Sequence, residues 1–377
     1  MNASAIQQFL LVIFLAIMAI ASQPATPSEA MNLEQQGKFA EAAEVWRQIV
    51  KENPTDAAAF ASLGVDLSRQ AKYSEAASAY KKALALNPSL PGIELNLGLA
   101  EFKQGRFTSA IAPLKAALRA EPSSVQARTL LGMSCYGSRR FSEAITYLEP
   151  LLDDQPENIE LRQTLAQSCL EAKNYSCAAE QFQKILRQNP DSAAAHILTG
   201  EALDGLQRTD QAIAEFQDAI RISPREPQLH FGLGYLYWKS HRYDQAKSEF
   251  ETELSISPAH AQSLAYLGDI ELKGGHLENA AALLEKSIQQ RSDIRIAYLG
   301  LGEIRAQQKQ YPAAIKAYAR AAELDPTQPD AHFRLARMYQ KTGQAEKANA
   351  EFAKTRELHE KSDAAVVLQL DRSHSAP

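Results

Sequence analysis

Apolar and small residues along the chain follow the three- and four-residue spacing that is typical of α-helices. In residues 57–90, polar turn residues divide this pattern into two stretches, and each stretch predicts one helix. The second stretch runs to Leu86 and ends at Asn87-Pro88, because proline has no backbone N–H and biases the preceding residue away from helical angles. The segment therefore predicts a pair of helices that is closed by a proline.

This closing proline recurs every 34 residues, and only Ser292 interrupts the series. Its members are Pro54, Pro88, Pro122, Pro156, Pro190, Pro224, Pro258 and Pro326. A small residue of the first helix recurs at the same step, as Ala30, Gly64, Gly98, Gly132, Ala166, Gly200, Gly234, Gly268, Gly302 and Ala336. An alanine of the second helix recurs as Ala42, Ala76, Ala110, Ala144, Ala178, Ala212, Ala246, Ala280, Ala314 and Ala348. The ten copies contain no insertion, so one repeat array is predicted and not several compact domains.

The copy that spans residues 227–260 carries the most informative motif. It contains His230, Leu233-Gly234, Tyr237, Ala246, Phe250 and Pro258. This pattern resembles the tetratricopeptide repeat, a helix–turn–helix unit of 34 residues. The resemblance implies an all-α fold, a right-handed α-solenoid (superhelix) of about ten repeats in which neighbouring units share one continuous core.

The two small columns predict close packing within each pair of helices. We expect the small residue of the first helix, such as Gly234, to face the alanine of the second helix, such as Ala246. Two small residues would allow the helix axes to approach to about 8 Å.

The N-terminal segment differs from the repeats. Phe9–Ala21 is an apolar run of 13 residues, which is shorter than the roughly 20 that span a membrane. Ala19 and Ala21 form a small-x-small cleavage motif, so residues 1–21 are predicted to be a signal peptide that leaves Ser22 at the N-terminus. We therefore expect an exported protein, periplasmic or secreted. No lysine or arginine precedes the apolar run, so an uncleaved N-terminal membrane anchor stays an alternative.

The repeat array is expected to cover residues 22–362. Its first repeat is incomplete, because Pro24 and Pro27 delay the start of its first helix to about Ser28. Residues 363–377 are predicted to form a short closing helix followed by a frayed C-terminal tail.

The three cysteines are too few for a disulfide framework. Cys135 and Cys169 occupy one column of adjacent copies, whose helix axes are expected ~10 Å apart, beyond the ~7 Å between Cα atoms that a disulfide permits. Cys169 and Cys177 flank the turn of one helix pair. Either a disulfide or two buried thiols fits that position.

Two prolines and three histidines depart from the repeat pattern. Pro113 and Pro150 fall inside second helices and are expected to bend them, with a local change in the curvature of the array. His196, His230 and His332 stand in the column that holds tryptophan in this family. We interpret them as partly exposed packing residues and not as metal ligands, because they lie in different layers of the stack.

Charge and motifs exclude several classes of function. A formal net charge of −5 and a pI near 6.0 argue against a nucleic-acid partner. The sequence contains no phosphate-binding loop, hydrolase elbow or metalloprotease helix, so we expect no catalytic residues, no metal site and no cofactor. A membrane association is expected only if the N-terminal segment is not cleaved.

The resemblance implies a non-catalytic scaffold that binds a partner protein or peptide in its concave face. The first helix of each repeat lines that face, so we expect partner binding by side chains that packing does not use. These are Phe231, Tyr235, Trp238 and Tyr266, a second apolar stretch of Leu95, Leu99, Phe102, Met133 and Tyr136, and the cations Arg334 and Arg337. For the leucines, packing against adjacent first helices is an equal alternative. The alternative function is a structural subunit of a cell-envelope secretion, pilus or polysaccharide-export assembly.

Overall fold

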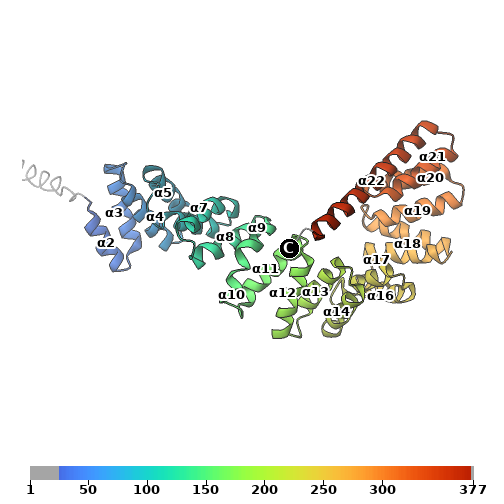
Figure 1. Cartoon of the computed structure of the whole chain (residues 1–377), viewed down its shortest axis with the longest axis horizontal. Coiled ribbons are helices and arrows are strands. Elements are labelled where there is room, and N and C mark those ends of the chain that lie inside the picture. Colours follow the sequence, from blue (N-terminus) through green and yellow to red (C-terminus); the bar gives the residue numbers. More distant parts are fainter. Residues whose placement is uncertain (1–24, 375–377) are drawn as a thin grey trace, which may run out of the picture. The chain divides into compact units, whose positions relative to one another are not determined.

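The computed structural model describes residues 25–374, and each predicted repeat in this range folds as a pair of helices (Figure 1). No β-strand occurs among the described residues. The first helices of the pairs are α2 (Pro27–Gln35), α4 (Ala57–Arg69), α6 (Ile93–Lys103), α8 (Val125–Gly137), α11 (Ile159–Glu171), α13 (Ala193–Gly205), α15 (Leu229–Lys239), α17 (Ala261–Lys273), α19 (Arg295–Gln307) and α21 (Pro329–Lys341).

The second helices complete the pairs. They are α3 (Phe39–Glu52), α5 (Tyr73–Leu86), α7 (Phe107–Ala120), α9 (Phe141–Leu148) with α10 (Leu151–Asp154), α12 (Tyr175–Gln188), α14 (Thr209–Ile222), α16 (Tyr243–Ile256), α18 (Leu277–Gln290), α20 (Tyr311–Leu324) and α22 (Ala345–His374). The all-α, helical-repeat fold is confirmed. The predicted signal peptide lies outside the described residues.

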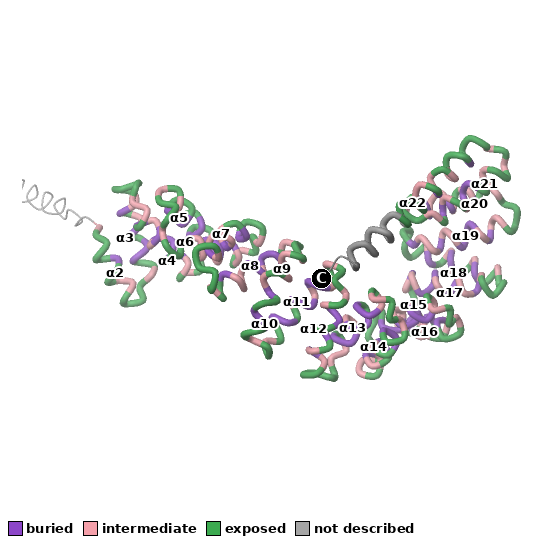
Figure 2. The backbone as a smooth tube through the Cα atoms, in the orientation of Figure 1, coloured by how far each residue is buried: buried purple, intermediate pink, exposed green. Residues whose placement is uncertain are grey.

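The chain divides into two compact units, Met1–Gln181 and Phe182–Pro377, and the division falls inside α12. Within each unit the helices pack mainly against those next to them along the chain. The buried residues lie along the faces where neighbouring helices meet (Figure 2). Each unit is therefore a stack of helix pairs with a core that continues from pair to pair.

At the small column the structure shows a close contact with a large side chain of the second helix. A Cβ atom at Gly234 would lie 2.7 Å from the ring of Phe250, and one at Gly64 would lie 2.5 Å from the ring of Tyr80. Both large residues stand 16 positions after the glycine and four positions after the recurring alanine of the second helix. At Gly200 the backbone oxygen of the column alanine Ala212 also lies 3.4 Å from such a Cβ atom, beside the ring of Phe216. The small residue makes room for one large side chain of the second helix.

The turn between the two helices of each pair adopts one conformation throughout. Its central residue has a positive φ in all ten copies, from Gly37 (73°) to Gly343 (73°). Glycine fills only part of this column, because Ala71, Arg139, Lys173, Gln207, His241 and Lys309 adopt the same left-handed conformation. Two backbone hydrogen bonds close each turn, such as those from His241 to Trp238 and from Arg242 to Tyr237. These bonds satisfy carbonyls at the end of the first helix.

The histidines of the tryptophan column form polar links that the sequence did not suggest. Nδ1 of His230 lies 2.6 Å from Oε2 of Glu249, and its Nε2 lies 3.1 Å from the carbonyl oxygen of Pro224. His196 makes the equivalent contacts to Glu215 and Pro190. Both rings are buried, which corrects the expectation of partly exposed packing residues. Each histidine ties the second helix of its pair to the loop that precedes the pair.

The two internal prolines have different effects. Pro150 separates α9 from α10, as the expected disruption of the second helix requires. Pro113 lies inside α7, which stays a single helix from Phe107 to Ala120. The predicted change of curvature stays a prediction.

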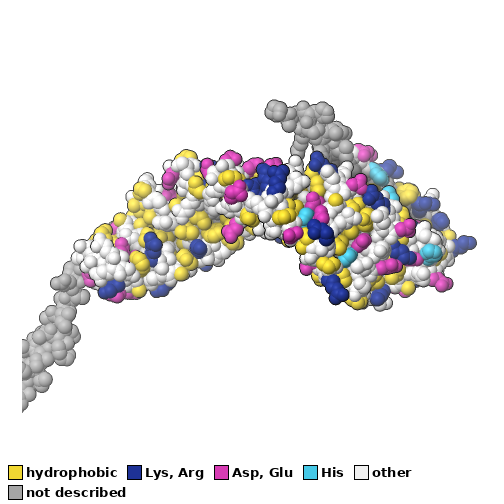
Figure 3. Space-filling view, turned by 90° about the horizontal axis from the view of Figure 1, so that it is seen from below, with side chains coloured by type: hydrophobic (Ala, Val, Ile, Leu, Met, Phe, Trp, Pro, Cys, Tyr) yellow, Lys and Arg dark blue, Asp and Glu magenta, His cyan; other side chains and the backbone are white. Residues whose placement is uncertain are grey.

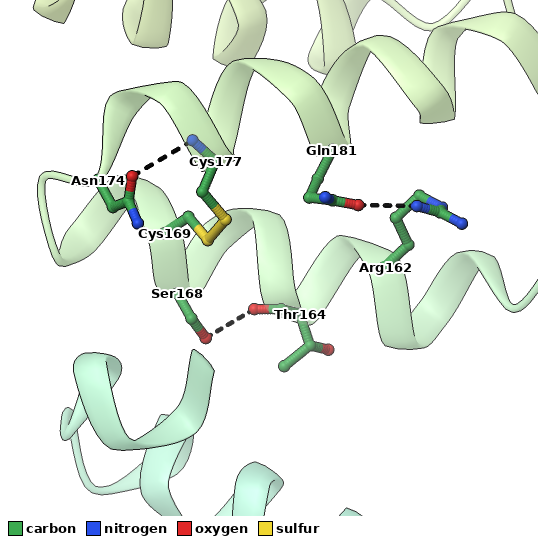
Figure 4. Close-up of a disulfide and its surroundings, with 7 residues drawn as sticks. All are labelled: Arg162, Thr164, Ser168, Cys169, Asn174, Cys177 and Gln181. Atoms are coloured by element: carbon green, nitrogen blue, oxygen red, sulfur yellow. Dashed lines mark hydrogen bonds between the residues drawn. A yellow bond between two sulfur atoms is a disulfide. The ribbon is translucent and has the colours of Figure 1, made fainter. Parts of the chain in front are cut away.

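Cys169 and Cys177 form a disulfide, with their Cα atoms 5.7 Å apart (Figure 4). The bond joins α11 to the first turn of α12 within one helix pair, so the alternative of two buried thiols is wrong. Cys135 is a buried free thiol, and burial raises its pKa to about 11. The absence of a Cys135–Cys169 bridge agrees with the prediction from repeat spacing.

The C-terminal helix is longer than predicted. α22 runs without interruption from Ala345 to His374, so residues 363–370 continue the second helix of the last repeat and do not form a separate closing helix. The helix also includes residues 371–374, which were expected to be frayed. At the other end, α2 begins at Pro27, next to the predicted Ser28. Among the described helices, none is both long enough and apolar enough to cross a membrane.

One buried carboxylate stands out in the N-terminal unit. Asp66 on α4 is fully buried, and neither carboxylate oxygen has a hydrogen-bond partner. Burial, with a smaller contribution from the nearby charge of Glu34, raises the pKa of Asp66 to about 7. The equivalent position in later copies holds only small or apolar residues, namely Ala100, Ser134, Ser168, Ala202, Leu236, Ile270, Ile304 and Met338. Asp66 is therefore a source of instability.

We predict that Asp66→Asn removes a pH-dependent loss of stability. Because the folded pKa is raised, the protein is most stable when Asp66 is protonated, and this stability is lost as the pH rises from about 4 to about 7. At about pH 8 the variant should be more stable than the wild type by about 1–3 kcal/mol. Circular-dichroism melts between about pH 5 and about pH 8 measure this. The exposed Glu41→Gln is the matched control, and an equal pH profile in wild type and Asp66→Asn would contradict the prediction.

Candidate functional site

A groove of about 950 Å³ lies in the C-terminal unit, along the first helices α15, α17, α19 and α21. The loop before α19 contributes Arg291 and Asp293. The groove is lined at one end by aromatic rings and along the rest of its length by charged and amide side chains. It brings together four of the predicted site residues, which are Tyr235, Trp238, Tyr266 and Arg334.

The aromatic wall consists of Tyr235, Trp238 and Tyr266. The ring centroid of Tyr266 lies 5.6 Å from that of Tyr235 and 4.9 Å from that of Trp238, both in edge-to-face contact. Tyr235 and Trp238 are nearly parallel, 6.1 Å apart. Phe231, also predicted to bind a partner, packs behind this wall against Phe250 and Tyr266 and does not line the groove.

Trp238 is not the free side chain that the sequence suggested. Its indole N–H donates a 2.7 Å hydrogen bond to Asp269 Oδ2 on the next first helix. The ammonium group of Lys273 lies 5.4 Å from the centre of its ring. Phe231, Trp238 and Tyr266 also pack against the hydrophobic core of this unit. The rings therefore hold adjacent repeats together as well as forming a surface, and Tyr235 is the member least tied to the core.

The charged groups of the groove are paired with one another. Four cations and four carboxylates line the groove, and each cation forms an ion pair with one of these carboxylates. The pairs are Lys273–Asp269, Arg291–Asp293, Arg295–Asp330 and Arg334–Glu303. The last of these, with Nη1 and Oε2 2.7 Å apart, joins α21 to α19. The groove is therefore neutral overall.

Four neutral polar groups of the groove have no hydrogen-bond partner among residues 25–374. They are the phenol hydroxyls of Tyr235 and Tyr266 and the side-chain amides of Gln262 and Gln328. Burial raises the pKa of Tyr266 to about 12, so its hydroxyl keeps its proton at neutral pH and can donate. The groove thus offers a ligand neutral hydrogen-bonding groups beside its ion-paired side chains.

The second predicted stretch lies in the N-terminal unit and is only half-buried. Leu95, Leu99 and Phe102 lie on α6, and Met133 and Tyr136 lie on α8. Phe102 packs edge-on against Phe107 at 5.4 Å, and the Tyr136 hydroxyl donates a 2.7 Å hydrogen bond to Gln167. Figure 3 shows hydrophobic side chains gathered in a band on the visible face of this unit, at the left of the view.

The two predicted arginines have different contacts. Arg334 lines the groove in its ion pair with Glu303, whereas Arg337 is exposed and lies over the ring of Phe333, 6.0 Å from its centre. Both arginines also line a smaller cavity of about 180 Å³, together with Met338 and Lys341. Binding of one acidic flank by both arginines stays a prediction.

Several residues of the groove were not predicted from the sequence. Asp269 and Glu303 stand 34 and 68 residues after Tyr235, so their position in the same repeat column could have predicted them. The ion pair of Arg295 with Asp330 had no such signal, because its partners come from different columns. Among the described residues, no cluster of histidine, cysteine or carboxylate side chains has the arrangement of a metal site.

These features define a helical-repeat protein in which the first helices of the C-terminal unit line a groove. Models of the tetratricopeptide repeat match residues 28–91, 62–124, 95–159 and 231–293, and further models of the same repeat match residues 136–202, 205–240, 302–343 and 330–362. The matches cover most of the sequence, and the chain belongs to the tetratricopeptide-repeat family.

The solved structures that match this chain share little sequence with it. The crystal structure of the Cut9–Hcn1 hetero-tetramer of the APC/C matches with a TM-score of 0.51 and 15% identity, covering 87% of this chain and 79% of that one. Yeast Tom70 matches with a TM-score of 0.44, 15% identity and coverage of 92% and 96%. YrrB, described as a TPR protein with an unusual peptide-binding site, matches with a TM-score of 0.37, 22% identity and coverage of 52% and 100%. No curated protein matches in sequence.

We predict that Trp238 and Tyr235 of the aromatic wall differ in their contribution to stability. Trp238→Ala removes a hydrogen bond and core contacts, and should lower the free energy of unfolding by about 2 kcal/mol or more. Tyr235→Ala removes a ring that is outside the core cluster and should cost clearly less. Urea unfolding followed by circular dichroism compares the two. Equal losses would mean that Tyr235 also belongs to the core.

Proposed function

We propose that this protein is a non-catalytic scaffold that binds an extended segment of a partner protein in the groove of its C-terminal unit. The observation that carries the proposal is the groove itself, with an aromatic wall at one end and unpartnered neutral polar groups beside it. Membership of a repeat family with extended binding surfaces supports a protein partner. Large aromatic side chains at such surfaces commonly contribute much of the binding free energy.

Tyr235 is the residue that we expect to contribute most to the binding of the partner. It lines the groove, its hydroxyl has no partner among the described residues, and its ring does not belong to the core cluster. Trp238 and Tyr266 act as the support that fixes its position. We also propose that the half-buried apolar surface of α6 and α8 is a secondary contact for a large partner.

A photoreactive residue at position 307 tests the proposal in cells. Gln307 is exposed and lines the groove, whereas Gln340 on α21 is exposed outside it. With p-benzoylphenylalanine at position 307, irradiation should give a discrete covalent adduct with one protein, and Tyr235→Ala should reduce its yield. Position 340 is the matched control. Adducts of equal yield at both positions, or none at position 307, would exclude the groove as the binding site.

We further propose that the protein acts outside the cytoplasm. Two observations support this location, the short apolar run at residues 9–21 and the disulfide between Cys169 and Cys177, since disulfides persist mainly in oxidising compartments. The expected mature chain begins at Ser22. Mass spectrometry of the N-terminal peptide from fractionated cells measures this. Recovery of the chain from the cytoplasmic fraction with its first residues intact would contradict the proposal, and recovery from the membrane with those residues intact would favour the anchor.

A further inference from the structure

We infer that the groove selects an extended peptide segment of low net charge, which it holds by an apolar side chain on the aromatic wall and by neutral hydrogen bonds to the peptide backbone. The inference rests on the function proposed above and specifies the chemistry of the ligand. It is carried by the way in which the groove divides its polar groups into those that are already paired and those that are not.

The charged groups are the ones already paired. Each of the four groove cations has a carboxylate partner within the groove, as described for Arg334 and Glu303. A ligand carboxylate that binds a remaining N–H group of an arginine would lie beside the carboxylate with which that arginine is already paired. The two negative charges would repel each other, which offsets the new contact. The groove therefore gains little from an acidic ligand.

A basic ligand meets the same difficulty at the aromatic wall. The ammonium group of Lys273 lies 5.4 Å from the ring centre of Trp238 and 5.8 Å from that of Tyr243, and it is also paired with Asp269. This position, between an aromatic face and a carboxylate, is the one that a cationic side chain of a ligand would favour. The lysine of the protein itself already fills it.

The neutral groups are the ones left available. The hydroxyls of Tyr235 and Tyr266 and the amides of Gln262 and Gln328 make no hydrogen bond to any other described residue. A hydroxyl can donate and accept, and a carboxamide has two donors and an acceptor. These groups match the N–H and C=O groups of an extended peptide backbone. The nearby rings and the side chains of Ile296 and Leu299 provide the apolar surface for an anchoring residue.

Selection of random dodecapeptides displayed on phage against the full-length chain tests the inference. We expect enriched peptides to carry aromatic or aliphatic residues and to have almost no net charge. Their affinity should change less than about twofold between about 50 mM and about 500 mM NaCl, because screening of surface charge should matter little. Tyr235→Phe and Tyr266→Phe keep the rings and remove one hydroxyl each. Each should weaken binding about fivefold.

Two variants make the test sharper. Tyr147→Phe, at a half-buried tyrosine of α9 outside the groove, is the matched control and should leave affinity unchanged. Glu303→Gln removes the carboxylate that neutralises Arg334, so selection on this variant should enrich acidic peptides that the wild type does not enrich. A groove that becomes selective for acidic peptides only after this change shows that the internal pairing sets the preference.

The remaining outcomes overturn the inference in distinguishable ways. Enrichment of strongly acidic or basic peptides on the wild type, with affinity that falls steeply in salt, would refute the preference for low charge while the function proposed above stands. Unchanged affinity in both tyrosine variants would exclude the hydroxyls as contacts to the backbone. Failure to enrich any peptide above the level on an unrelated helical protein would refute this inference together with peptide binding in the groove.

Discussion

The whole architecture depends on one contact, in which a large side chain of the second helix lies directly over a glycine of the first. At Gly234 the ring of Phe250 occupies the space in which a Cβ atom would lie, and the same relation recurs at Gly302 with Tyr318. This contact sets the separation of the two helices in each pair, because the ring fills the gap between the backbones. Of the four first helices that line the groove of the C-terminal unit, α15, α17 and α19 carry this glycine, whereas α21 has Ala336 in its place.

Repetition explains why so much of the fold could be predicted from the sequence. The proline, small-residue and alanine columns predicted the positions of the helices, and the same columns placed Tyr235 and Tyr266 on one surface. The errors concern contacts that cross from column to column. The close contact of Gly234 with Phe250 depends on the rotation of each helix about its axis, which spacing alone does not give. The hydrogen bond from Trp238 to Asp269 depends on the offset between adjacent repeats.

The polar replacements in the tryptophan column show how the array tolerates the loss of a large aromatic residue. His230 links Glu249 to the carbonyl of Pro224. Arg162 bonds in the same way to Gln181 (Figure 4) and to the carbonyl of Pro156. A buried polar side chain is acceptable here because both of its ends meet partners. The loop that an indole would cover by packing is instead tied by hydrogen bonds, so the column keeps its structural role while its residue type changes.

The left-handed turns give the protein a property that has little to do with binding. Six of them place a side chain, such as that of Arg139 or His241, in a conformation that costs an L-residue about 1 kcal/mol relative to glycine. Glycine at these positions would therefore make the protein more stable. The positions occur in both units and do not line the groove. Because these turns are equivalent and independent, glycine can replace the left-handed residue of each turn one at a time. Destabilising changes elsewhere, including those that reshape the groove, can therefore be offset without touching the residues that bind.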